Sequence, residues 1–143
     1  MKKFNLLFLV VLLFNLTSFS QTTNKKVFFK DCTAKEFKSN LDTSSNYLLI
    51  DLRPVKKFKK ERIKTAKSVP DTKALFYLID KYDKNTPIFI YSEVGDESLS
   101  AAALLMRKGY NKIYHLQEGI DGWYSDGYRL CKDKIDNNEL GHL

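Results

Sequence analysis

The run Pro87-Ile88-Phe89-Ile90-Tyr91 places the strongest constraint on what this chain can fold into. Four consecutive large apolar residues suit a strand that is buried on both faces, and such strands occupy the interior of parallel sheets. A second apolar run, Tyr47-Leu48-Leu49-Ile50, ends at Asp51 and has the same character. The sequence therefore predicts an α/β fold, with a mostly parallel central sheet flanked by helices on both faces.

Helix signals separate these apolar runs. Thr33 and Glu36 have the spacing of a capping box that opens a helix to about Leu41. Asp71 is placed to cap a second helix, and Gly109 is placed to end a third. We further expect strands at 27–29 and 112–116 and helices at 98–108 and 120–125. The 143 residues contain no internal repeat, so one domain is expected.

The N-terminal segment has the pattern of an export signal. Two lysines precede an apolar run, Leu6–Leu16, which ends at the small-residue junction Ser18-Phe19-Ser20. This pattern predicts a cleaved signal peptide over residues 1–20 and a protein that is periplasmic or secreted. An uncleaved membrane anchor is the rival interpretation, but the run is shorter than the roughly 20 residues that cross a bilayer. We expect a polar leader over residues 21–26 and no stable transmembrane span after cleavage.

Positive charge is concentrated in one stretch of the chain. Cleavage would remove two lysines and no acid, which lowers the formal net charge from +7 to +5. Residues 56–67 carry one acid, Glu61, among these basic residues: Lys56, Lys57, Lys59, Lys60, Arg62, Lys64 and Lys67. Two interpretations are open. The stretch is a solvated face, or it binds an anionic partner, either an envelope protein or an anionic surface, through Lys56, Lys57, Lys59 and Lys60. Export would separate the protein from nucleic acid, so we expect no nucleic-acid partner.

The two cysteines of the chain, Cys32 and Cys131, lie near the two ends of the mature sequence. An oxidising compartment favours a disulfide between them, but the sequence leaves their proximity open. Neither has a second ligand at metal-binding spacing or the neighbours of a nucleophile.

The order of several motifs resembles the rhodanese-like superfamily over about residues 27–130. The matching motifs are Asp51-Leu52-Arg53-Pro54 followed by Phe58, then Ile63, Ala66 and Val69-Pro70, the loop Tyr91–Ser98, Gly109-Tyr110, Ile113–Leu116, and finally Gly119, Trp123 and Gly127. The resemblance implies one rhodanese-like domain over residues 27–130. We expect the remaining residues, 131–143, to form a loosely ordered polar tail.

The loop after the central strand carries the chemistry that the resemblance implies. Family members have a cysteine nucleophile at the start of this loop, where backbone N–H groups and a helix dipole hold a charged sulfur donor. Here Ser92 takes that position, and Glu97 stands where many members have an arginine. The loop reads Ser92, Glu93, Val94, Gly95, Asp96, Glu97 and then Ser98. Because a serine cannot form the persulfide intermediate and three carboxylates would repel thiosulfate, the resemblance implies an inactive homologue without cofactor or metal.

Other expectations concern the surroundings of this loop. Asp96 or Glu97 would occupy the former anion site from within, with a cation site or plain solvent exposure as alternatives. The resemblance implies that Asp51 and Arg53 form a structural pair near the loop. It also places Lys57 where an acid is common and Arg62 where a histidine is common.

A serine hydrolase would require a histidine within reach of Ser92. The only histidines are His115, inside an expected strand, and His142, in the tail. We expect His115 to serve ordinary strand packing, which disfavours this activity.

Three functions remain open on the sequence. The first is a non-catalytic binding or scaffolding module of the bacterial cell envelope. The second is a sulfurtransferase-like enzyme that acts on a sulfur-containing anion through the atypical Ser92 loop. The third is a mainly structural role.

Overall fold

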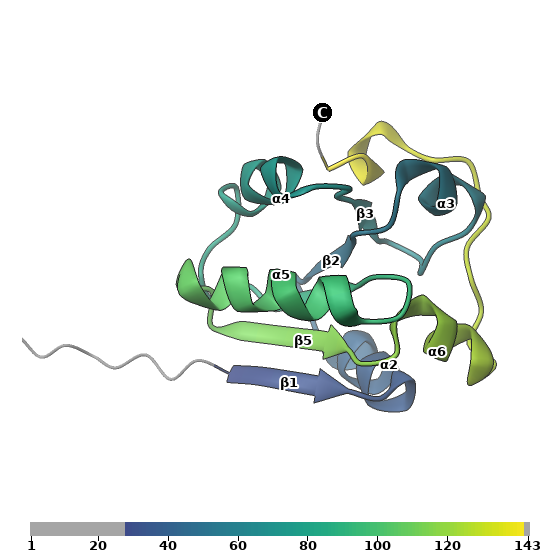
Figure 1. Cartoon of the computed structure of the whole chain (residues 1–143), viewed down its shortest axis with the longest axis horizontal. Helices are drawn as coiled ribbons and strands as arrows, with labels where there is room; N and C mark the ends of the chain where they lie inside the picture. Colours follow the sequence, from purple (N-terminus) through teal and green to yellow (C-terminus); the bar gives the residue numbers. More distant parts are fainter. Residues whose placement is uncertain (1–27, 142–143) are drawn as a thin grey trace, which may run out of the picture.

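A five-stranded sheet forms the centre of the computed structural model, which describes residues 28–141 (Figure 1). The expected signal peptide and polar leader lie outside the described residues. The elements follow in the order β1 (Phe28–Cys32), α2 (Ala34–Thr43), β2 (Leu48–Asp51), α3 (Val55–Lys60), β3 (Lys67–Ser68), α4 (Thr72–Ile79), β4 (Ile88–Tyr91), α5 (Asp96–Arg107), β5 (Lys112–Leu116), α6 (Gly119–Ser125) and the 3-10 helix η2 (Asn137–Glu139). None of the helices described is long and apolar enough to cross a membrane.

All five strands of the sheet run parallel, in the order β1-β5-β4-β2-β3. The apolar run that most constrains the fold forms β4, which lies at the centre of this order, and all four residues of β4 are buried. The expected α/β fold is therefore confirmed. The capping box of Thr33 and Glu36 and the Asp71 cap are also present, at the starts of α2 and α4.

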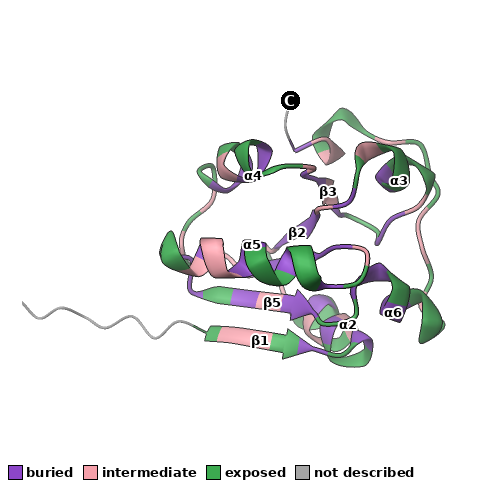
Figure 2. Cartoon of the chain, in the orientation of Figure 1, coloured by how far each residue is buried: buried purple, intermediate pink, exposed green. Residues whose placement is uncertain are grey.

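Two hydrophobic clusters cover the two faces of the sheet. Figure 1 shows the helices beside the sheet, and Figure 2 colours the buried residues purple. Ile88 and Ile90 belong to the cluster that includes residues of α4 and α5. Phe89 and Tyr91 alternate with them and belong to the cluster that includes residues of α2, α3 and α6. Strand alternation therefore explains why β4 is apolar at every position.

Two glycines with positive φ angles bracket α5. Gly95 has φ +104° and Gly109 has φ +87°, a region that side-chain-bearing residues seldom adopt. The chain turns at Gly95, so α5 begins at Asp96 and not at Ser98 as the sequence predicts. Asp96 and Glu97 consequently lie in the first helical turn, where the helix dipole stabilises carboxylates.

The C-terminal segment is packed against the domain, which contradicts the expected loose tail. Cys131 and Arg62 exchange both backbone hydrogen bonds, at 3.0 and 2.7 Å, and the Gly141 N–H donates to the Ser68 carbonyl at 3.1 Å. The Arg62 side chain, 1% exposed, donates from Nη2 to both carboxylate oxygens of Glu139 at 2.8 Å. A buried guanidinium requires an anionic partner, and the tail supplies it.

The two cysteines are free thiols, so the disulfide left open by the sequence is not formed. Cys32 ends β1, the strand at one edge of the sheet, whereas Cys131 pairs with Arg62 in the segment that leads to β3 at the other edge. Burial raises the pKa of the Cys32 thiol to about 11, which keeps it protonated and unreactive at neutral pH.

We predict that Glu139→Gln destabilises the protein by on the order of 3 kcal/mol, because it leaves the Arg62 charge buried without its partner. Urea unfolding followed by circular dichroism would measure the change. Glu97→Gln is the matched control, since Glu97 is exposed, and we expect it to cost less than about 0.5 kcal/mol. Equal stabilities of the two variants would show that the tail ion pair contributes nothing.

The two glycines that bracket α5 predict different costs for the same substitution. A Cβ atom on Gly95 would lie 2.0 Å from the Gln117 carbonyl oxygen, whereas one on Gly109 would meet nothing within 4 Å. Gly109→Ala should therefore cost only the backbone strain, about 1 to 2 kcal/mol. Gly95→Ala should cost about 3 kcal/mol or more in the same unfolding assay. A Gly109 variant as unstable as the Gly95 variant would contradict the steric explanation.

Candidate functional site

The loop from Ser92 to Gly95 joins the carboxyl end of β4 to the N-terminus of α5. Its backbone folds around the Ser92 side chain, which is 1% exposed. The N–H groups of Gly95 and Ser98 point at Ser92 Oγ, at 3.2 and 3.3 Å, and donate to it. The loop therefore directs its amides at the one side-chain oxygen that stands at its start.

A chain of polar side chains continues from Ser92 beneath the loop. Ser92 Oγ lies 3.1 Å from Ser98 Oγ, and Ser98 Oγ lies 3.0 Å from His115 Nε2. The other ring nitrogen, His115 Nδ1, lies 2.8 Å from Asp31 Oδ1. The sequence predicts only ordinary strand packing for His115, but its ring also makes polar contacts with Asp31 and Ser98. The sequence could not place it under the loop, because that depends on the register of β5 against β4.

The position of His115 does not make Ser92 a hydrolase nucleophile. His115 Nε2 also lies 2.9 Å from the Gly95 carbonyl oxygen, which can only accept a hydrogen bond. Ser98 Oγ stands between this nitrogen and Ser92 Oγ, so His115 does not contact the hydroxyl that a general base would have to deprotonate. The second histidine of the chain, His142, lies outside the described residues.

Asp51 and Arg53 form the buried pair that the resemblance implies. Arg53 Nε and Nη2 donate to the Asp51 carboxylate at 2.7 to 3.1 Å. The Asp51 side chain is 0% exposed and the Arg53 side chain is 3% exposed. Arg53 Nη2 also donates to the Glu61 carbonyl oxygen at 2.7 Å. Beside this pair, the Tyr91 hydroxyl accepts from the Ile63 N–H at 3.2 Å, and burial raises the Tyr91 pKa well above its usual value. These contacts hold the segment after α3 against the ends of β2 and β4.

The carboxylate that approaches the buried arginine is Glu93. Its Oε1 lies 3.0 Å from Lys57 Nζ, and its Oε2 lies 4.0 Å from Arg53 Nη1. Glu93 Oε2 is buried and accepts no hydrogen bond from the described residues. The expectation that Asp96 or Glu97 occupies the former anion site is wrong, because Ser92 accepts the loop amides and Glu93 lies next to the cations.

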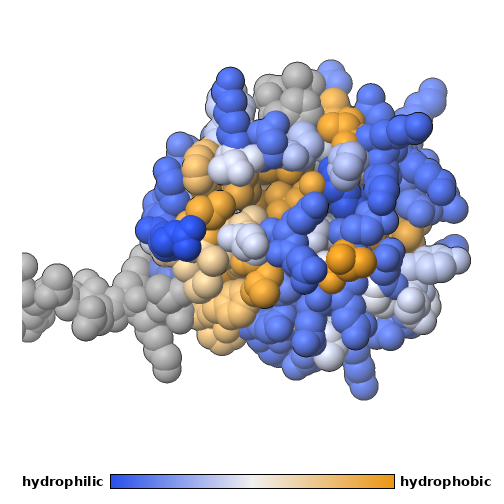
Figure 3. Space-filling model, in the orientation of Figure 1, coloured by the Kyte–Doolittle hydropathy of each residue, from blue (hydrophilic) through white to orange (hydrophobic). Residues whose placement is uncertain are grey.

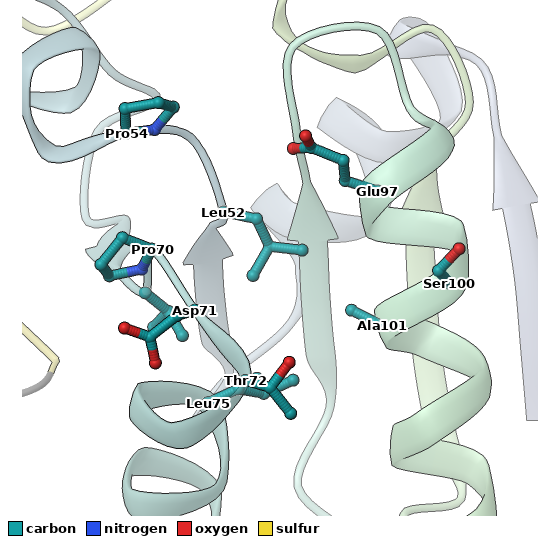
Figure 4. A pocket seen from close by; sticks show the side chains of 10 residues that line it. Leu52, Pro54, Pro70, Asp71, Thr72, Leu75, Glu97, Ser100 and Ala101 are labelled. Atoms are coloured by element: carbon teal, nitrogen blue, oxygen red, sulfur yellow. The ribbon is translucent and has the colours of Figure 1, made fainter.

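Asp96 and Glu97 are exposed in the first turn of α5. Glu97 projects from the helix over a separate pocket of about 270 Å³, toward the segment that carries Leu52 (Figure 4). Val94 is 57% exposed at the tip of the loop. The cation-site alternative gains no support, because residues 28–141 bring no three His, Cys, Asp or Glu side chains together as metal ligands.

Comparison with known proteins finds relatives whose names describe them as sulfurtransferases. The chain is similar to the adenylyltransferase and sulfurtransferase UBA4 of Meyerozyma guilliermondii, with 28% identity over 90 residues that make up 58% of this chain and 21% of that protein. The chain thus spans about a fifth of that relative. It is also similar to the thiosulfate sulfurtransferase GlpE of Actinobacillus succinogenes, with 29% identity over 84 residues, 59% of this chain and 75% of that protein.

Solved structures share the fold. A rhodanese-related protein from Thermoplasma volcanium superimposes with a TM-score of 0.60 and 18% identity, over 76% of this chain and 99% of that chain. The sequence model described as "Rhodanese-like domain" matches residues 33–126, from the start of α2 to the end of α6. Since this match covers more than half of the 143 residues, the chain belongs to the rhodanese-like domain family.

Proposed function

We propose that this chain is an exported rhodanese-like domain without sulfurtransferase activity, which acts as a binding or scaffolding module in the bacterial cell envelope. Export rests on the N-terminal sequence pattern. The proposed absence of activity rests on the environment of Ser92, because the loop amides of a catalytic member would hold a charged sulfur there. In this chain Gly95 and Ser98 direct those N–H groups at a neutral hydroxyl.

Electrostatics beside the loop support the same proposal. Glu93 lies within 4.0 Å of Arg53 and within 3.0 Å of Lys57, so a carboxylate of the chain already compensates both cations. An incoming thiosulfate dianion would have to displace that carboxylate or accept its repulsion. Both the nucleophile and the charge that would attract an anionic substrate are therefore altered.

The second candidate is a sulfurtransferase-like enzyme that uses this atypical loop. It is favoured by the amides that still converge on position 92 and by the sulfurtransferase relatives UBA4 and GlpE. Because a serine cannot carry a persulfide, such an enzyme would need a different nucleophile, for example a cysteine that a partner supplies.

We predict that the mature protein has no thiosulfate:cyanide sulfurtransferase activity and that Ser92→Ala leaves this background unchanged. Turnover in the wild type that disappears in Ser92→Ala would refute the proposal. Mass spectrometry after incubation with thiosulfate should likewise detect no added sulfur.

The substitution Ser92→Cys separates the effect of the missing nucleophile from the effect of the Glu93 charge. The thiolate that it introduces could attack the outer sulfur of thiosulfate, so that a new S–S bond forms as the old one breaks and sulfite leaves. Cyanide would then take the sulfur as thiocyanate and regenerate the thiolate. We predict that Ser92→Cys combined with Glu93→Gln is at least about tenfold more active than Ser92→Cys alone, because the nearby negative charge is removed. Equal activities would show that Glu93 does not oppose the anion.

The surface proposed for partner binding is the exposed side of α3. Phe58 is buried and anchors the helix, while Lys56, Lys57, Lys59 and Lys60 are all exposed. Among the described residues, only Lys57 of these four forms an ion pair. In Figure 3 the side of the molecule on which α3 lies is predominantly hydrophilic. Unpaired lysines on one short helix favour an anionic partner or surface.

We predict that the mature protein cosediments with vesicles that contain phosphatidylglycerol, but not with vesicles of phosphatidylcholine alone, and that added salt weakens the binding. Reversal of the four α3 lysines to glutamate should abolish it. Reversal of Lys35, Lys73, Lys81 and Lys112, which lie elsewhere, should reduce it much less. If both variants bind alike, α3 is an ordinary solvated face, and the structural role becomes the better interpretation.

A further inference from the structure

We propose that a pocket on the α2 and α6 side of the sheet binds a small aromatic carboxylate. The pocket has a volume of about 410 Å³, within the usual range for small-molecule sites. It lies between α2, the segment after α3 and the segment after α6, and the residues that carry the argument are Tyr47, Ile63, Lys64, Thr65, Trp123 and Arg129. No residue of the Ser92–Gly95 loop lines it, so this site is independent of the function proposed above.

The charge of the pocket selects an anion. Lys64 and Arg129 are exposed at its rim, and neither forms an ion pair with any described residue. The remaining two charged groups, Lys38 and Asp42, pair with each other along α2. Two cations are therefore left to face a ligand, and the planar fork of an arginine matches the two oxygens of a carboxylate.

The floor of the pocket is apolar and includes an aromatic ring. Ile63 and Trp123 are each 2% exposed and form this floor together with Leu41. The indole N–H of Trp123 donates to the backbone carbonyl of Arg129 at 3.2 Å, which fixes the ring. The half-buried Tyr47 ring lies on another wall. A flat apolar ligand body would bury its surface against these groups while its charged end meets the rim.

Backbone strain is present at the same place. Thr65 has φ +72°, a left-handed conformation that is unfavourable for a β-branched residue. Its Oγ1 lies 3.0 Å from the Tyr47 hydroxyl, and this hydrogen bond holds the strained residue at the pocket. Strain of this kind is concentrated at sites of function, and here it presents two hydroxyl groups beside the unpaired cations.

Trp123 is the only tryptophan of the chain and it lines this pocket, so its fluorescence can report on binding there. Titration of the mature protein with phenylacetate should produce a saturable change in Trp123 emission that weakens as salt is added. The neutral isostere phenylacetamide should bind at least about tenfold more weakly, and the cation phenethylamine should not bind. Equal binding of all three, or no change with phenylacetate at millimolar concentration, would overturn the proposal.

Charge-reversal variants locate the binding. Lys64→Glu and Arg129→Glu should each weaken phenylacetate binding about tenfold or more, and Lys73→Glu on α4 is the matched control that should not. The Arg129 substitution keeps the backbone carbonyl that fixes Trp123, so a loss would come from the charge. The Ser92 variants and the four-lysine α3 variant should bind phenylacetate normally. Loss of binding in the Lys73 control, or its retention in both rim variants, would contradict a site at this pocket.

Discussion

The buried ion pair of Asp51 and Arg53 is the interaction on which the carboxyl edge of the sheet depends. Both side chains are almost completely buried, so each charge depends on the other as its ionic partner. Arg53 uses its remaining donor capacity to hold the carbonyl of Glu61 after α3 and to approach Glu93 in the loop. One guanidinium therefore sets the relative positions of β2, α3 and the loop.

Local signals carried most of what the sequence could predict. The apolar run of β4, the Thr33 capping box and the Asp71 cap each act within a few residues, and all three are present. The sequence predicts that α5 begins at Ser98, two residues later than it does, because the turn that starts the helix depends on the positive φ angle of Gly95. The contact of His115 with Ser98 could not be predicted, since it follows from the register of two strands distant in sequence.

Two departures from the family pattern are each matched by an acid of this chain. Lys57, where an acid is common, meets Glu93 of the loop, and Arg62, where a histidine is common, meets Glu139 of the tail. Each of these two cations is therefore neutralised by an acid from another segment of the chain.

The ion pair of Arg62 and Glu139 also has a consequence for the order of folding. The two residues are 77 positions apart, and Glu139 belongs to the last few residues of the described chain. Until that segment is available, Arg62 has no carboxylate partner, and β3 lacks the segment that pairs with Ser68. Contacts between distant residues form late, because the intervening chain must first be ordered. Closure of the tail is thus the step that completes the domain, and a growing chain cannot reach its final stability before Glu139 and Leu140 have been synthesised.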